Sequence, residues 1–155
     1  METPSSPSTV AQYMQSDVVW VHHHATIREA MKIFVEQKIN SVVVVDDDHR
    51  VVGMLSSIDV IQYIVPDYLE EDRHLASFEA GDVFARRVRE VADQPVTRSM
   101  SKDIKTIQPN HTLIAAVTLL SEHRINQLPV VDETGKLIGY IGRSNIKQAI
   151  HDALS

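Results

Sequence analysis

The chain has 155 residues and a formal net charge of −6, with 43% hydrophobic and 23% charged residues. This is the composition of an ordinary globular protein, and the negative charge disfavours binding to a nucleic-acid backbone. Because the chain contains no cysteine, disulfides, thiolate metal sites and a cysteine nucleophile are excluded.

The first nine residues differ in composition from the rest of the chain. They are rich in Pro, Ser and Thr and lack the apolar core of a signal peptide and the arginines of a transit peptide. No apolar run in the sequence approaches the ~20 residues needed to cross a bilayer. We therefore expect residues 1–9 to be a disordered tail. We expect the protein to be cytoplasmic and to bind neither a membrane nor nucleic acid.

An internal repeat organises the rest of the chain. An offset of 86 positions places Met14 on Met100 and keeps residues 10–60 in register with the second half without a gap. One offset held over this length indicates two copies of the same unit. Further identical pairs include Asp17 and Asp103, Thr26 and Thr112, Ala30 and Ala116, Glu36 and Glu122, Ile39-Asn40 and Ile125-Asn126, Val44-Val45-Asp46 and Val130-Val131-Asp132, and Gly53 and Gly139.

The first copy predicts a strand, a helix, a two-stranded hairpin and a closing helix. A short apolar run at 18–21 is the first strand, and Thr26 with Glu29 forms a capping box that starts the helix. The hairpin strands are residues 41–45 and 51–55, separated by a polar turn, and Ser56 or Ser57 caps the closing helix. The expected apolar face of the first helix consists of Ile27, Ala30, Met31, Phe34 and Val35.

The second copy repeats this order. Thr112 opens its first helix, residues 128–131 and 137–141 form the hairpin, and Ser144 starts a closing helix with Ile146 and Ile150 facing inward. Between the copies, we expect one or two helices covering the pair. One of them begins near Gly81-Asp82 and carries Phe84, Val88 and Val91 on one face.

Two motifs resemble the tandem CBS (cystathionine β-synthase-type) domain pair. The segment Gly53-Met54-Leu55-Ser56-Ser57-Ile58-Asp59 is similar to the family's Gly, apolar, Ser/Thr and Asp motif, and Leu128-Pro129-Val130-Val131-Asp132 resembles its Pro-Val-Val-Asp strand. The resemblance implies an α/β (α+β) fold of two pseudo-symmetric βαββα repeats. We place repeat one at 10–64, a helical insert at 65–95 and repeat two at 96–155.

The resemblance also implies a ligand. The family binds adenosine compounds, namely AMP, ADP, ATP or S-adenosylmethionine, in clefts between its two repeats, as regulatory ligands rather than catalytic cofactors. A carboxylate accepts hydrogen bonds from both ribose hydroxyls, and a helix N-terminus favours a phosphate. The implied contacts in the main cleft are Ser56, Asp59, Thr106, Ile125, Gln127, Pro129 and Arg143, with Arg124 as another candidate for the phosphate.

A second, weaker cleft follows from the pseudo-symmetry. Its Ser/Thr position is Gly142 and its Asp position is Asn145, which lacks the negative charge that strengthens a contact to a ribose diol. Trp20 stands where the main cleft has Thr106. We predict one competent site, or one strong and one weak. The implied contacts of the weaker cleft are Trp20, Ile39, Ser41, Val43 and Asn145.

Simpler interpretations remain open for these residues. Ser56 is also a good N-cap, and Asp59 an acid that the helix dipole favours.

His22, His23 and His24 are consecutive, and no carboxylate is expected near them, so we predict a polar loop and no metal site. No Walker loop, Gly-x-Ser-x-Gly or His-Glu-x-x-His motif occurs in the sequence.

The sequence thus predicts a regulatory module that senses an adenosine nucleotide and is not an enzyme. We expect a homodimer and, since no effector domain is present, a possible separate effector protein. The main rival is a dimerisation scaffold without ligand binding, and a second is a metal-dependent enzyme that uses the histidines.

Overall fold

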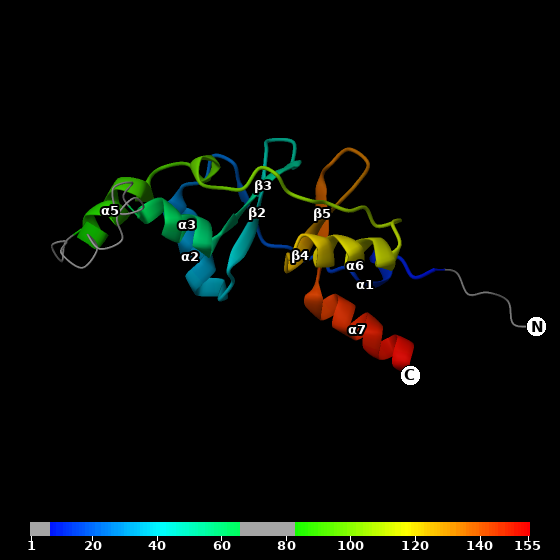
Figure 1. Cartoon of the computed structure of the whole chain (residues 1–155). Coiled ribbons are helices and arrows are strands. Elements are labelled where there is room, and N and C mark those ends of the chain that lie inside the picture. Colours follow the sequence, from blue (N-terminus) through cyan, green and yellow to red (C-terminus); the bar gives the residue numbers. More distant parts are fainter. Residues whose placement is uncertain (1–6, 66–82) are drawn as a thin grey trace, which may run out of the picture. The chain divides into compact units, whose positions relative to one another are not determined.

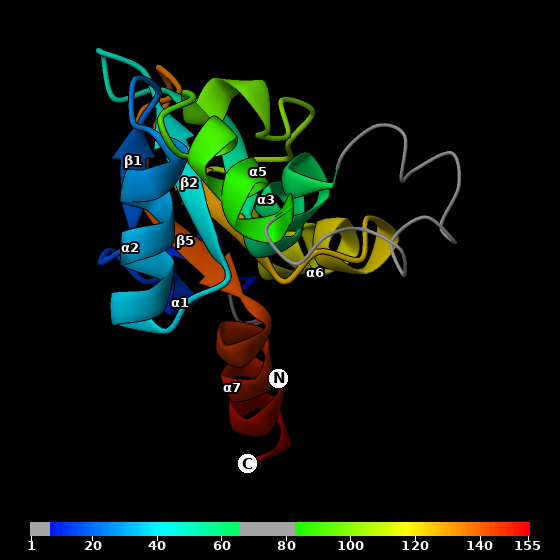
Figure 2. The same cartoon turned by 90° about the vertical axis from the view of Figure 1, so that its left-hand side faces the viewer.

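The computed structural model describes residues 7–65 and 83–155, and the chain forms two compact units (Figures 1 and 2). Unit 1 comprises Met1–Val19, Asp48–Val51 and Ile104–Ser155, and unit 2 comprises Trp20–Asp47 and Val52–Asp103. Most of repeat one therefore lies in unit 2 and most of repeat two in unit 1. Among the residues described, no helix is both long enough and apolar enough to cross a membrane.

Unit 2 is built on a three-stranded sheet with strand order β1-β2-β3, in which β1 and β2 are parallel. Buried β-branched side chains fill the middle strand, as expected for a strand covered on both faces. Its elements are β1 (Trp20–His22), α2 (Ile27–Gln37), β2 (Ser41–Val45), β3 (Val51–Ser56, of which Val51 belongs to unit 1), α3 (Ser57–Ile64), α5 (Val83–Ala92) and a 3-10 helix (Val96–Arg98).

Helix α2 begins as the sequence predicts. The Thr26 hydroxyl accepts a hydrogen bond from the Glu29 backbone N–H at 3.2 Å, which satisfies one of the free donors of the first turn. Ile27, Ala30 and Phe34 are buried. The prediction for Val35 is wrong, because its side chain is 71% exposed, on the flank of the buried stripe.

Unit 1 contains an antiparallel hairpin extended by a single parallel bridge between Ile107 and Val130. That bridge occupies the position of the β1–β2 pairing between Val21 and Val44 in unit 2, so the 86-residue offset holds in three dimensions. The elements of unit 1 are α1 (Val10–Tyr13), α6 (Leu113–Glu122), β4 (Gln127–Val131), β5 (Leu137–Gly142) and α7 (Arg143–Leu154). Its buried core consists of Val10, Ile107, Ala116, Leu120, Leu128, Val130 and Ile141.

Three further predictions need correction. The first strand of repeat one is Trp20–His22 rather than 18–21. Ile150 is 55% exposed, because the buried positions of α7 are Asn145 and Ala149, and Ile150 lies a further 100° around the helix. Phe84 is 69% exposed, while Val91 of the same helix is buried. The predicted helix start at Gly81-Asp82 lies outside the described residues.

The repeats exchange their leading segments between the units. In unit 2, Met54 and Ser101 exchange backbone hydrogen bonds of 3.0 and 2.8 Å, and in unit 1 Tyr140 and Gln15 exchange two of 2.8 Å. The glycine before each of these hairpin residues makes the close approach possible. A Cβ on Gly53 would lie 2.6 Å from the Met100 sulfur, and one on Gly139 would collide with the Gln15 carbonyl oxygen.

Candidate functional site

The junction between β3 and α3 carries the Ser56–Asp59 motif. The Ser56 hydroxyl accepts a hydrogen bond from the Asp59 N–H at 3.2 Å, and Asp59 Oδ2 accepts one from the Ser56 N–H at 2.9 Å. This reciprocal capping box holds both side chains at the start of α3. Both residues are partly exposed, and Asp59 Oδ1 is not part of the box. A hydroxyl, a carboxylate and the N-terminal amides of a helix therefore lie together at this junction.

The equivalent junction between β5 and α7 uses different residues. Asn145 Oδ1 accepts a hydrogen bond from the Gly142 N–H at 2.8 Å, which reproduces the Ser56–Asp59 backbone contact. Asn145 is only 8% exposed, and Gly142 offers no hydroxyl. This junction therefore has neither the charge nor the hydroxyl of its counterpart.

The remaining residues predicted for the main cleft all lie in unit 1. Gln127 pairs with Gly142 across the hairpin, and the fully buried Pro129 accepts a backbone hydrogen bond from Ile107 at 3.1 Å. Thr106 and Arg143 are exposed, and Ile125 is partly buried beside the core. Ser56 and Asp59 lie in unit 2, so the predicted set is divided between the units.

The residues predicted for the weaker cleft are divided in the same way. In unit 2, Trp20 pairs with Val43 in the parallel register, and its side chain is 45% exposed while Val43 is buried. Ser41 begins β2 and Ile39 lies two residues before it, and both are partly exposed. Asn145 belongs to unit 1.

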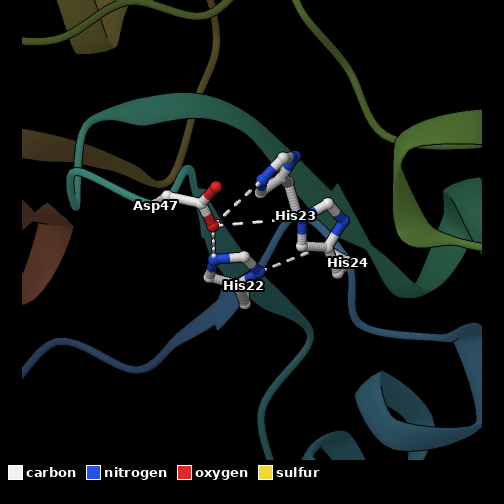
Figure 3. Close-up of side chains that lie close together, drawn as sticks. All are labelled: His22, His23, His24 and Asp47. Atoms are coloured by element: carbon white, nitrogen blue, oxygen red, sulfur yellow. Dashed lines mark hydrogen bonds and ion pairs between the residues drawn. The ribbon is translucent and has the colours of Figure 1, made fainter.

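The structure contradicts the expectation that no carboxylate lies near the three histidines. His22, His23 and His24 converge on the carboxylate of Asp47, and their potential ligand atoms all lie within 4.8 Å of one another (Figure 3). The sequence-based expectation placed the histidines along an irregular loop and overlooked Asp47. A signal was present in the sequence, since both segments directly follow predicted strands that are joined by one helix, an order that makes the strands parallel and brings their carboxyl ends to one sheet edge.

Comparison with known proteins establishes the family. The model of the CBS domain matches residues 10–66 and 88–152, well over half of the chain, and the chain belongs to this family. The two matched segments correspond to the two repeats, so the molecule is a tandem CBS pair.

Relatives differ in how much surrounds this pair. The "uncharacterized 17.7 kDa protein in bps2 3′ region" of Acidianus ambivalens is 26% identical over 143 residues, which cover 92% of this chain and 73% of that protein. Homoserine O-acetyltransferase of Methanocorpusculum labreanum is 25% identical over 136 residues, but these are 88% of this chain and only 23% of the enzyme. The crystal structure of CBSX2 of Arabidopsis thaliana in complex with AMP has a TM-score of 0.72 and 25% identity, and covers 96% of this chain and 99% of that one.

Proposed function

We propose that this CBS pair is a regulatory module, without catalytic activity of its own, that binds an adenosine nucleotide in the cleft between its repeats. AMP, ADP, ATP and S-adenosylmethionine are the candidate ligands. CBSX2, which has the same fold over nearly the whole of both chains, was solved with AMP. The matched segment is a minor part of the homoserine O-acetyltransferase, so the catalytic name of that relative is not carried over.

The observation that carries this proposal is that the Ser56–Asp59 junction has a hydroxyl and a carboxylate that helix capping does not require. At the equivalent junction, Asn145 and Gly142 make the same backbone contact without a charge and without a hydroxyl. Capping the helix therefore does not require the carboxylate of Asp59. A partly exposed carboxylate with one oxygen outside the capping box suits the two hydroxyls of a ribose.

The second half of the proposed site comes from unit 1. We propose that Thr106, Ile125, Gln127 and Pro129 contact the base and that Arg143 pairs with a phosphate. A ligand that contacts both repeats can shift the equilibrium between two arrangements of the repeats. The size of the shift is set by the difference between the ligand's affinities for the two arrangements. We propose that the response is passed on through the geometry of a homodimer or to a separate effector protein.

Calorimetric titration with the four ligands tests the proposal, and Asp59→Asn is the informative variant. Asn preserves the cap, as Asn145 shows, but removes the charge. We expect saturable binding near one ligand per chain, weakened roughly tenfold or more in Asp59→Asn, by analogy with other charge-assisted contacts. Asp103→Ala, at an exposed position of unit 2, is the matched control and should bind as the wild type does.

A second candidate function is a dimerisation scaffold that binds no nucleotide. The uncharged Gly142–Asn145 junction favours it, because one of the two clefts already lacks the binding groups. Ile58 and Ile61, which are 54% and 56% exposed on one face of α3, offer an apolar surface. A dimer in sedimentation experiments that responds to none of the four ligands would replace the sensor with the scaffold.

A further inference from the structure

A tight turn brings the three consecutive histidines together. In an extended strand, their side chains would point alternately to opposite faces. Here β1 ends at His22, and the Ala25 N–H donates to the His22 carbonyl oxygen at 2.8 Å, so His23 and His24 occupy the centre of a turn. The His23 N–H remains bonded to the Val45 carbonyl oxygen at 2.8 Å. The turn is thus anchored to the sheet, and the three imidazoles face one region, as Figure 3 shows.

The fourth group comes from the neighbouring strand. His22 lies opposite Val45 in the parallel register, and Asp47 follows two residues later. Asp47 Oδ1 lies 2.6 Å from His22 Nε2, 3.6 Å from His23 Nε2 and 3.9 Å from His24 Nε2. One carboxylate oxygen is therefore the common neighbour of three ring nitrogens.

The three separations from the Asp47 oxygen approach the edges of a small coordination polyhedron, and the four ligand atoms all lie within 4.8 Å of one another. Zinc binds imidazole nitrogen and carboxylate oxygen at about 2.0–2.2 Å, so the edges of a tetrahedral site are roughly 3.3–3.5 Å long. The His23 and His24 distances to Asp47 exceed this by only a few tenths of an ångström. Only the His22–Asp47 pair is shorter, because these groups are hydrogen-bonded to each other. Small rotations of exposed side chains would open that edge around an ion.

An unsatisfied atom lies within the cluster. His23 Nε2 is buried and makes no hydrogen bond in the described part of the chain, although it points toward Asp47. A buried polar atom without a partner is rare in proteins and costs free energy, and a bound ion is one way of satisfying it. The rings of His23 and His24 are also packed closely, with centroids 3.9 Å apart.

Asp47 supplies the acidic group of the cluster, and a carboxylate oxygen is a common zinc ligand. His22 and His24 also line an open pocket of about 480 Å³ together with Trp20 and Glu29. An ion can reach the cluster from this pocket.

We propose that His22, His23, His24 and Asp47 form a binding site for a divalent transition-metal ion, with Zn²⁺ as the best match. Three imidazoles and one carboxylate are typical zinc ligands, and the softer thiolate ligands are absent. Metal binding by His22 breaks one hydrogen bond. In this structure, His22 Nδ1 accepts a hydrogen bond from the His24 N–H at 3.3 Å. That bond is lost when Nε2 binds the metal and the proton moves to Nδ1. All four residues belong to unit 2, and none of them is among the proposed nucleotide contacts.

Calorimetric titration of the full chain with Zn²⁺, after dialysis against a chelator, tests the site. We expect one ion per chain with micromolar or tighter affinity. Asp47→Asn is the primary variant, because its side chain is 75% exposed and the fold should not depend on it. Loss of one ligand should weaken binding roughly tenfold or more. His123→Asn, which changes an exposed histidine outside the cluster, should leave Zn²⁺ binding unchanged.

Substitution with Co²⁺ gives a second readout. A tetrahedral Co²⁺ site has intense visible absorption bands, which should appear in the wild type and in His123→Asn but not in His23→Asn. Circular dichroism would show whether His23→Asn is folded, and Asp47→Asn supplies the test if it is not. Absence of stoichiometric Zn²⁺ uptake by the wild type, or equal uptake by wild type and Asp47→Asn, would overturn the proposal. Nucleotides are absent from both experiments, so failure of the nucleotide proposal would not affect the result.

Discussion

The two strand-to-helix junctions share one backbone geometry but differ in exposure. In unit 1, Asn145 is buried and its side chain satisfies the Gly142 N–H. In unit 2, Asp59 does the same for Ser56 while remaining partly exposed. A buried cap contributes to the core, because water cannot replace it, whereas an exposed cap can also contact a ligand. The two copies of one unit thus differ at this junction, where one capping side chain is packed in the core and the other is accessible to solvent.

The largest expected effect concerns the glycine that lies three residues before each junction. A Cβ at Gly139 would meet the Gln15 carbonyl oxygen, a backbone atom that cannot move away without breaking its bridge. Gly139→Ala should therefore lower the free energy of unfolding by about 1–3 kcal/mol, as overpacking typically does. A Cβ at Gly53 would lie 2.6 Å from the movable sulfur of Met100 and 2.8 Å from the Ser101 carbonyl oxygen, a smaller overlap with the backbone than at Gly139, so Gly53→Ala should cost less. Urea denaturation of both variants measures the difference, and equal losses would contradict this explanation.

A smaller effect is expected from removing the caps themselves. Asn145→Ala leaves the Gly142 N–H buried without a partner and should cost roughly 1–2 kcal/mol. Asp59→Ala leaves the partly buried Ser56 N–H to be hydrogen-bonded by water, and should lower the free energy of unfolding by less than about 1 kcal/mol. Thermal unfolding monitored by circular dichroism distinguishes the two. A greater loss for Asp59→Ala would mean that the exposed junction is the more structural one.

The smallest effect depends on pH and concerns the hairpin turn before the unit 1 junction. The side chain and backbone of Thr134 and the Lys136 N–H donate to Asp132 Oδ1, and these bonds, with Thr134 the larger contributor, lower the pKa of Asp132. Because the pKa is lower in the folded state, the contribution to stability is present above the unfolded value of about 3.9 and is lost as the pH falls through the folded value.

Thermal unfolding of Asp132→Asn across this range measures that contribution. The melting temperature of the variant should lie below that of the wild type at neutral pH, and the gap should narrow below about pH 4. A gap that stays constant with pH would show that the ionised carboxylate adds nothing beyond its hydrogen bonds.

Local sequence signals predicted much of the fold. The caps at Thr26 and Thr112, the alternation of strands and turns and the repeat offset depend on neighbouring residues, and the structure contains the elements that they predict. The CBS family was also identified correctly. The prediction that Val35 and Ile150 face the core was wrong, because the periodicity of apolar residues locates a buried stripe on a helix but not its width.

The histidine cluster and the segment exchange needed three-dimensional information. Whether His23 and His24 continue a strand or turn back depends on the hydrogen bond from Ala25 to His22, which no local pattern revealed. Likewise, an alignment of two repeats cannot show whether Gln15 pairs with its own hairpin or with Tyr140. The sharing of a nucleotide by Asp59 and Thr106 is still a prediction.

The segment exchange has a consequence for synthesis on the ribosome. The residues of unit 2 lie between Trp20 and Asp103, so this unit can close while the second repeat is still being translated. Gln15 leaves the ribosome before unit 2, but its partner Tyr140 is made only later. The same holds for Tyr13, whose hydroxyl donates a hydrogen bond to the Asp152 carboxylate at 2.9 Å. The leading segment is thus made before unit 2 but is packed only after the second repeat has been made, which exposes Val10 to chaperones and to other nascent chains in the meantime.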